Sequence, residues 1–270
     1  MAADRETSIR RAMEVLMSLG SEEAMSQGGM RVTEIGERLG REKSQVSRAL
    51  KVLAEYGLVE RNHDALSYRL GWRIYALAQL GGRPRMLEAA SPRLRALAAR
   101  TQERAHLSVL QGAEVLTLLS ESAGRAVEAV GWVGRMTPAY CTSAGRALLF
   151  DHDRDQLEAR FAGVELHRLA PNTPTDLDAV AALVEEARER GYALCDEEFE
   201  AGLVGVAAPV RDATGAIVAS FNVSAPTFRV ADHAELVKAV QEGVGELTAA
   251  LHADDGGNGT GPVEPIVTRP

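Results

Sequence analysis

A tight turn between two short helical segments constrains the fold of this chain most. Apolar residues recur at helical spacing over residues 8–20, 33–40 and 42–57. Gly40 and Gly57 stand where the second and third segments end, and glycine is favoured in the left-handed conformation that ends many helices. The polar stretch 21–29 between the first two segments is expected to be a loop.

Two strands are expected after the third helical segment. Residues 58–61 and 67–70 have the composition of strands, and Asn62, His63 and Asp64 between them favour a turn. The sequence thus indicates three helices, the last two joined by a tight turn, and then a hairpin. This order predicts a winged helix-turn-helix over residues 1–70.

The third helical segment has two unlike faces. Val46, Leu50 and Leu53 share one side of a helical wheel and are expected to face the core. The opposite side suits DNA, because Arg pairs with guanine, Gln with adenine, and Ser and Lys with phosphates. A solvated surface helix is the alternative for this segment alone, but the tight turn and the hairpin favour DNA recognition. The candidate DNA-contacting residues are Arg41, Lys43, Ser44, Gln45, Ser47, Arg48, Lys51, Arg61 and Asn62.

The charge of the chain is unevenly distributed. The formal net charge is −8, yet residues 1–80 carry 12 basic and 11 acidic residues, so that part has a net charge of +1. Residues 38–73 carry 8 basic and 4 acidic residues. A locally basic module on an acidic body is consistent with a contact to double-stranded DNA.

The rest of the chain mixes strands and helices. Residues 71–80 predict a helix that Gly81, Gly82 and Pro84 interrupt, so residues 71–90 are expected to be a linker, and Ser91 with Pro92 is expected to begin the next helix. Strands are expected over 106–111, 115–120, 192–195, 204–210 and 216–224, and helices over 142–150, 177–190 and 232–251. This order predicts an α+β domain over 91–252. The Gly- and Pro-rich residues 253–270 are expected to be a disordered tail.

Composition excludes several classes of protein. The chain is 46% hydrophobic and 25% charged, as in ordinary globular proteins, and no apolar run approaches the ~18 residues that span a bilayer. The first residues contain no apolar signal segment. Two cysteines, Cys141 and Cys195, are too few for a disulfide framework. We therefore expect a cytoplasmic protein with no membrane partner.

Several motifs resemble the IclR family of bacterial transcription regulators. They are VTEIGERLGREKSQVSRALKVLAEYGLVERN, YRLGWRIYALA, AHLSVLQGAEVLTL, VGRMTPAYCTSAGRALL and RERGYALCDEEFEAGLVGVAAPVRDATGAIVASFNVSAP, which together cover roughly residues 8–250. The resemblance implies a winged helix-turn-helix domain, a linker helix and a C-terminal effector-binding domain of GAF-like fold. It also implies a homodimer or homotetramer that binds a palindromic operator and responds to a small organic acid.

The resemblance also implies where the effector binds. Small residues precede an apolar helical run at 141–145, and matching to relatives places the acid group at Ser143 and Ala144; a tight helix–strand junction is the alternative for these small residues. Strand alternation puts Asn222 and Ser224 on one face, which is either the pocket or a polar outer face. Asn222 stands where relatives often carry Ser. The expected effector-binding residues are Ala126, Ala129, Thr137, Ser143, Ala144, Cys195, Leu203, Gly205, Asn222 and Ser224.

These wall residues indicate the class of effector. They are mostly small or apolar and include no Arg or Lys, so backbone N–H groups must hold any anion. A carboxylic acid or a related carbonyl compound is therefore favoured over a phosphate. The room beyond the acid group favours an aromatic acid over a two-carbon acid.

An enzyme is the other class to consider. Cys141 or Cys195 with His106 or His167 could form a nucleophile and base, but no flanking signature accompanies them. The acidic run 196–198 is more often a solvated strand end than a catalytic or metal site. We expect no catalysis, no metal and no cofactor. The remaining alternative to a DNA-binding regulator is a small-molecule sensor whose N-terminal helices mediate protein contacts.

Overall fold

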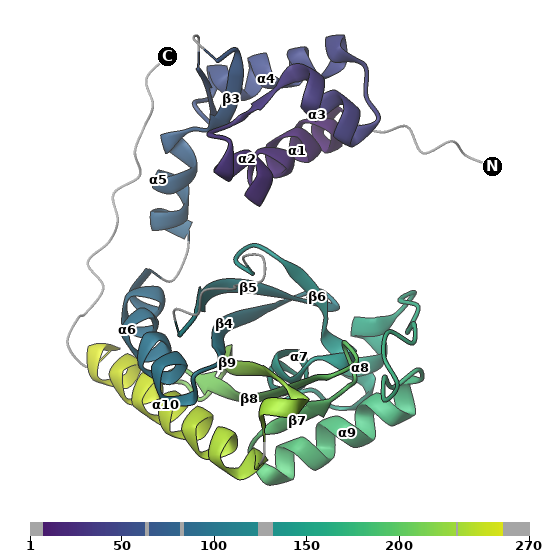
Figure 1. Ribbon diagram of the computed structural model, residues 1–270, viewed down its shortest axis with the longest axis vertical. Coiled ribbons are helices and arrows are strands. Elements are labelled where there is room, and N and C mark those ends of the chain that lie inside the picture. Colours follow the sequence, from purple (N-terminus) through teal and green to yellow (C-terminus); the bar gives the residue numbers. More distant parts are fainter. Residues whose placement is uncertain (1–7, 63–64, 82–83, 124–131, 231, 256–270) are drawn as a thin grey trace. The chain divides into compact units, whose positions relative to one another are not determined.

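The computed structural model describes residues 8–62, 65–81, 84–123, 132–230 and 232–255 (Figure 1). The chain divides into two compact units, residues 1–84 and 85–270. Within the described ranges, no helix combines the length and the apolar character needed to cross a membrane. The expected disordered tail lies largely outside the described residues.

The first unit is a winged helix-turn-helix, as predicted. Its helices α1 (Ser8–Leu19), α3 (Val32–Leu39) and α4 (Lys43–Glu55) bury one core, which includes Val15, Ile35, Val46 and Leu50. Gly40 adopts the left-handed conformation, with φ 61°, and ends α3 before α4 begins. The wing strands are β2 (Val59–Asn62) and β3 (Ser67–Leu70), and β1 (Met30–Arg31) pairs with β3 on the other side.

The predicted loop over residues 21–29 is wrong for its first part, where Glu22–Ser26 form the short helix α2. The Oγ of Ser21 accepts the N–H of Ala24 and so caps this helix. The side chain of Ala24 is buried in the core of the unit. A polar stretch with a single buried alanine shows no helical periodicity. The sequence therefore gives no sign of this helix, which forms because Ala24 is buried.

The helix after the linker begins earlier than predicted. Helix α5 (Trp72–Gly81) matches the expected linker helix, but α6 runs from Pro84 to Thr101 and contains Pro92 in its interior. Proline lacks an N–H and removes one hydrogen bond from a helix interior. Ala90, Leu94 and Ala98 are nevertheless fully buried on both sides of Pro92. Burial of this continuous apolar face offsets the lost bond.

The second unit is an α+β domain, as predicted, built on a six-stranded antiparallel sheet with strand order β6-β5-β4-β9-β8-β7. Its strands are β4 (Arg104–Gln111), β5 (Glu114–Glu121), β6 (Met136–Pro138), β7 (Ala193–Asp196), β8 (Leu203–Arg211) and β9 (Ile217–Pro226). Its helices are α6, α7 (Ser143–Leu148), α8 (Arg154–Phe161), α9 (Leu177–Arg190) and α10 (His233–Asp255), with 3-10 turns η1 (Ala139–Cys141) and η2 (Thr227–Arg229). The sequence did not predict the short elements β6 and α8, of which β6 has too few residues for a periodic signal.

The two faces of this sheet differ in polarity. Leu107 on β4 and Phe221 and Val223 on β9 are buried in one core with residues of α6 and α10, and these two helices cover that face (Figure 1). Successive side chains of a strand point to opposite faces. The neighbouring residues His106 and Asn222 therefore belong to the other face, on the side of α7.

A buried ion pair joins α7 to the segment after β7. Arg146 and Glu198 are only 3% and 7% exposed, and the two guanidinium Nη atoms of Arg146 donate to both carboxylate oxygens of Glu198. Arg146 Nη1 also donates to the carbonyl of Leu194 at 2.8 Å. The expectation of a solvated strand end is thus wrong for Glu198. Its partner is 52 residues away in the sequence, so no local pattern reveals the pair.

We expect Arg146→Leu to destabilise the protein by about 3–5 kcal/mol, because it leaves the Glu198 carboxylate buried without its partner. The double variant Arg146→Leu/Glu198→Leu should recover much of this loss. Urea denaturation at neutral pH measures both. Arg190→Leu, which removes an exposed ion pair with Glu186, is the control and should cost at most about 1 kcal/mol. A loss as small as the control for Arg146→Leu would show that the buried pair does not hold α7 in place.

Candidate functional site

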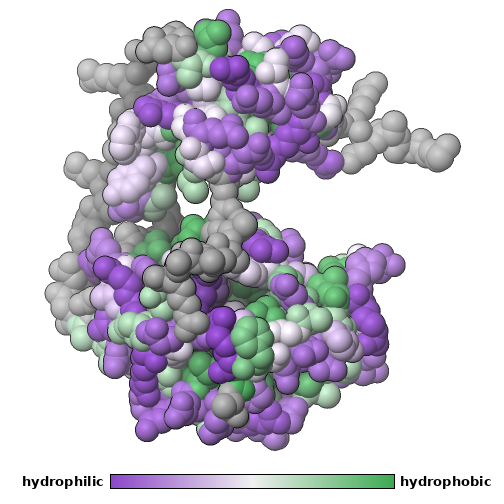
Figure 2. Space-filling view, in the orientation of Figure 1, coloured by the Kyte–Doolittle hydropathy of each residue, from purple (hydrophilic) through white to green (hydrophobic). Residues whose placement is uncertain are grey.

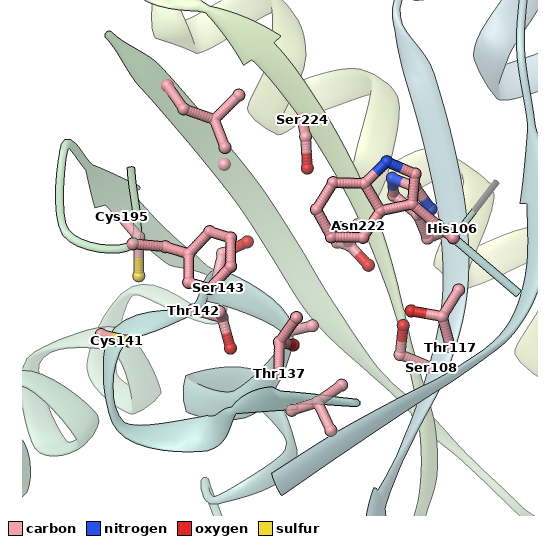
Figure 3. A pocket seen from close by; sticks show the side chains of 16 residues that line it. His106, Ser108, Thr117, Thr137, Cys141, Thr142, Ser143, Cys195, Asn222 and Ser224 are labelled. Atoms are coloured by element: carbon pink, nitrogen blue, oxygen red, sulfur yellow. The ribbon is translucent and has the colours of Figure 1, made fainter. Parts of the chain in front are cut away.

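A cavity lies between the polar face of the sheet and the start of α7 (Figure 3). Part of this cavity opens to solvent. The lining residues come from β4, β5, β8 and β9, from the segments around β6 and β7, and from α7. They are His106, Ser108, Val115, Thr117, Trp132, Thr137, Cys141, Thr142, Ser143, Ala144, Cys195, Phe199, Leu203, Gly205, Asn222 and Ser224.

Most of the residues that the sequence predicts for the effector pocket line this one cavity. They are Thr137, Ser143, Ala144, Cys195, Leu203, Gly205, Asn222 and Ser224. Ala126 and Ala129 lie outside the described residues.

The sequence prediction missed part of the cavity wall. It omitted His106 and Ser108 on β4 and Val115 and Thr117 on β5, although strand alternation puts the two residues of each strand on one face. It also omitted Trp132 and Phe199, which lie outside regular strands and helices and which no local pattern marks. Only the folded chain brings these two aromatic rings to the cavity.

Close backbone packing explains the glycine in the first turn of α7. The Oγ1 of Thr142 accepts the N–H of Gly145 at 3.2 Å and caps the helix. A Cβ atom at Gly145 would lie 2.2 Å from the carbonyl oxygen of Ala139, so this position requires glycine. The tight-junction alternative therefore holds for Gly145, whereas Ser143 and Ala144 line the cavity. The N–H groups of a first helical turn have no acceptor within the helix, so these two residues can donate to an anion.

Strand β8 approaches α7 closely at Gly205. A Cβ atom at Gly205 would lie only 2.7 Å from the Oγ of Ser143. Glycine at this position therefore lets the strand and the helix meet at the cavity, and a larger residue would displace the Ser143 side chain.

The sheet side of the cavity is polar and buried. His106 on β4 and Asn222 on β9 are directly paired across the two strands and are 3% and 7% exposed. Neither His106 Nδ1 nor Asn222 Oδ1 has a hydrogen-bond partner in the part of the chain that the structure describes. Desolvation, together with the charge of Arg104, lowers the pKa of His106 to about 3. The imidazole is therefore neutral at pH 7.

Two aromatic side chains complete the wall. The ring of Trp132 lies edge-on to His106, with centroids 5.5 Å apart, and its centroid is 6.5 Å from that of Phe199. The guanidinium of Arg135 lies 4.3 Å from the centre of the Trp132 ring. These rings offer flat apolar surface to a ligand.

Cys141 and Cys195 are not poised as nucleophiles. Burial raises the pKa of the Cys141 thiol to about 12, and burial also raises the pKa of the Cys195 thiol. Both thiols are protonated at pH 7, and the thiol is a weak nucleophile. Among the described residues, no group of three or more His, Cys, Asp or Glu side chains could hold a metal ion.

Polar and basic side chains cover the exposed face of α4. They lie opposite the buried Val46, Leu50 and Leu53, so the predicted division of this helix into two faces is confirmed. Arg61 and Asn62 are exposed on the wing, and the Arg61 guanidinium lies 5.9 Å from the centre of the Tyr68 ring. The exposed candidates on α4 are Lys43, Ser44, Ser47, Arg48 and Lys51.

Three candidate DNA contacts also hold the unit together or lie partly inside it. Arg41 is half-buried and forms an ion pair of 3.3 Å with Glu14 on α1. Gln45 is half-buried at the edge of the core face. The Oδ1 of Asn62 accepts the N–H of Ala65 at 3.3 Å and so supports the wing turn.

Two family descriptions match this chain. Residues 8–63 match the IclR helix-turn-helix domain, and residues 82–249 match the bacterial transcriptional regulator IclR C-terminal domain. The cavity lies within the second match.

Individual relatives match over nearly their whole length. The regulator KdgR of Escherichia coli K12 is 28% identical over 253 residues, covering 92% of this chain and 90% of KdgR. The regulator XynR of the same strain is 30% identical over 230 residues, covering 85% and 89%. An IclR homologue from Microbacterium hydrocarbonoxydans, solved in complex with 4-hydroxybenzoate, superposes with a TM-score of 0.78 at 26% identity, covering 92% of this chain and 100% of that chain.

The folds of the two units agree with these matches. The protein belongs to the IclR family of bacterial transcriptional regulators.

Proposed function

We propose that this regulator binds a palindromic operator as a homo-oligomer and changes its operator affinity when a small organic acid fills the cavity. The observation that carries the proposal is the gathering of eight predicted effector residues around one cavity, in a chain whose other unit is a winged helix-turn-helix. Coupling between the two sites requires that the acid prefers one conformation of the protein.

The chemistry of the cavity supports an acid as the effector. Its described lining contains no Arg or Lys, so the amides of Ser143 and Ala144 are the donors that we assign to the carboxylate. Trp132, Phe199 and Leu203 offer apolar surface for the rest of the ligand. The relative solved with 4-hydroxybenzoate supports an aromatic acid over a two-carbon acid.

The exposed face of α4 supports direct reading of DNA bases. Arg48 lies in the middle of the helix, and its Nε donates to the carbonyl of Ser44, which leaves the Nη atoms for a base. Lys43, Ser44 and Ser47 lie in the first two turns of the helix, where their side chains suit phosphates. We assign Arg61, on the wing, to the DNA backbone.

Exposed apolar side chains on α1 and α5 support an oligomer. Met13 and Met17 on α1 are 50% and 69% exposed, and Leu77 and Leu80 on α5 are 51% and 73% exposed. Leu16 and Ile74 beside them are half-buried. Hydrophilic side chains cover much of the visible surface of this unit, and smaller apolar areas lie between them (Figure 2). We propose that these side chains pair between protomers in a homodimer or homotetramer, which places two copies of α4 about one helical turn of DNA apart.

A sensor whose N-terminal helices only contact other proteins is the alternative function. Phosphate contacts release counterions, so DNA binding that weakens steeply with salt supports the regulator and counts against this alternative. The relatives reported above are transcriptional regulators, and a catalytic role would require turnover of a substrate.

Arg48→Ala should reduce selectivity for the operator by about 1–3 kcal/mol, because one base contact is lost. Arg61→Ala should weaken operator and random DNA alike and lower the salt dependence by about one ion. Fluorescence anisotropy against a duplex selected from a random library measures both effects across a salt series. Arg190→Ala, on α9 of the other unit, is the control. Unchanged specific and non-specific affinity for Arg48→Ala would rule out α4 as the recognition helix.

Sedimentation at micromolar concentration should give a dimer or a larger species for the wild type. Leu77→Glu/Leu80→Glu should dissociate it, because burying two carboxylates at an interface is costly. Leu169→Glu changes an exposed leucine of the other unit and should leave the assembly intact. A wild-type monomer that binds a palindrome with one-to-one stoichiometry would contradict the proposed oligomer.

Benzoate-type acids should raise the melting temperature and alter operator affinity, since a ligand that binds only the native state stabilises it. Acetate and glyoxylate should do so less. Leu203→Trp fills the cavity and should abolish both responses, and Asn222→Ala/Ser224→Ala should weaken them. Leu169→Trp adds the same side chain at an exposed leucine outside the cavity lining and should respond as the wild type. If Leu203→Trp also responds as the wild type, the effector site lies elsewhere.

A further inference from the structure

Helix α5 is attached to the rest of the first unit at its start. The N–H of Gly71, directly before α5, donates to the carbonyl of Leu58 at 2.8 Å. A Cβ atom at Gly71 would lie 2.3 Å from the carbonyl oxygen of Gly57, so the start of α5 packs on the backbone that follows α4. This contact requires glycine at position 71 and fixes the point from which α5 begins.

Glu60 on β2 makes a second contact to the start of α5. Its Oε1 accepts the N–H of Trp72, the first residue of the helix, at 3.4 Å. The N–H groups of a first helical turn have no acceptor within the helix, and a carboxylate there also interacts favourably with the helix dipole. Its Oε2 accepts from Nε and Nη2 of Arg69 at 3.3 and 3.0 Å. Glu60 and Arg69 are partners across β2 and β3, so the wing itself orients the carboxylate.

Beyond its first turn, α5 is exposed. Residues 75–80 are all exposed, whereas Gly71 is buried and Ile74 is half-buried. Figure 1 shows α5 leading away from the wing strands. The contacts at its start therefore set the direction of this helix. The contact at Gly71 alone would leave the helix free to tilt, and the hydrogen bond from the Trp72 N–H to Glu60 opposes that tilt.

A small tilt at the start of α5 becomes a larger displacement at its far end. A helix rises about 1.5 Å per residue, so Leu80 lies about 12 Å from Trp72 along the helix axis. A tilt of about 10° therefore moves Leu80 by about 2 Å. In a two-fold assembly that pairs through α5, the tilt occurs in both protomers. The two copies of α4 then shift by roughly 4 Å, close to the ~3.4 Å that separates neighbouring base pairs.

We infer that Glu60 is a positioning residue that sets the direction of α5 relative to α4, and thereby the half-site spacing that the oligomer accepts. This inference rests on the proposed function, since it takes α4 to read a half-site and α5 to pair between protomers. Glu60 needs no contact with DNA for this role. Without its carboxylate, the two copies of α4 would take a range of separations, so that palindromes of several spacings would bind.

Binding of the full-length protein to a set of palindromic duplexes tests this inference. A duplex selected from a random library supplies the half-sites, and its centre is shortened or lengthened by one or two base pairs. In fluorescence anisotropy, the wild type should bind the selected spacing about tenfold or more tightly than the others, because a rigid two-fold reader fits one spacing. Glu60→Ala should reduce this preference to about threefold or less. Duplexes with a single half-site should bind both proteins alike, because α4 itself is unchanged.

Two further variants separate positioning from the mere loss of a surface ion pair. Glu60→Gln keeps an oxygen that can accept the N–H of Trp72, so it should restore most of the wild-type preference. Glu23→Ala is the matched control, because Glu23 forms an exposed ion pair of 3.2 Å with Arg38 in the same unit and its loss changes the net charge equally. This control should keep the full preference.

Trp72→Pro tests the same hydrogen bond from its donor side, and it replaces Glu60→Ala if that variant does not fold. Proline lacks the N–H but is favoured at the first position of a helix. The difference between Trp72→Pro and Trp72→Ala isolates the bond to Glu60, since only the alanine variant keeps the donor. Trp72→Pro should bind the altered spacings almost as tightly as the selected one.

The outcomes separate the inference from the proposed function. A wild type with a clear spacing preference, and the same preference in Glu60→Ala or Trp72→Pro, would overturn the role of Glu60 and leave the proposed operator binding standing. A loss of preference in Glu23→Ala as large as in Glu60→Ala would also overturn it. A wild type that binds all spacings equally, or no palindrome at all, would overturn the proposed operator and the role of Glu60 with it.

Discussion

The alternation of side chains along β4 and β9 governs the second unit. One face of these strands carries Leu107, Phe221 and Val223, which are buried beneath α6 and α10. The residues between them, His106 and Asn222, must then face the opposite side, where the cavity lies. The apolar face supplies the stability of the domain, because burying apolar surface drives folding. The same alternation therefore places the polar side chains of these strands in the cavity.

Buried polar groups in this domain are of two kinds. Arg146 and Glu198 satisfy each other through paired hydrogen bonds, and they tie α7 to the segment after β7. His106 and Asn222 keep polar atoms without partners. The first kind holds the cavity wall in place, and the second leaves binding capacity in that wall. Arg146 and Glu198 support the first turn of α7. The domain can therefore keep its fold although His106 and Asn222 have polar atoms without partners.

The winged helix-turn-helix depends on a smaller set of contacts. Gly40 turns the chain between α3 and α4, and the apolar side of α4 fills the core, so the polar side of α4 stays exposed. The ion pair of Arg41 with Glu14 ties this turn to α1. Arg41, which the sequence predicts to contact DNA, thus helps to hold the first unit together.

The sequence alone determined those features that depend on local periodicity. Helical spacing defined α4 and α9, strand alternation put Asn222 and Ser224 on one face, and glycine marked the turn before α4, because the chain expresses these patterns within a few residues. Resemblance to a family placed Ser143, Leu203 and Gly205 together. The tertiary structure alone decided the rest. Burial on both sides kept Pro92 inside α6, a partner 52 residues away buried Glu198, and folding brought Trp132 and Phe199 to the cavity. Each of these depends on contacts between distant residues, which no short stretch of sequence records.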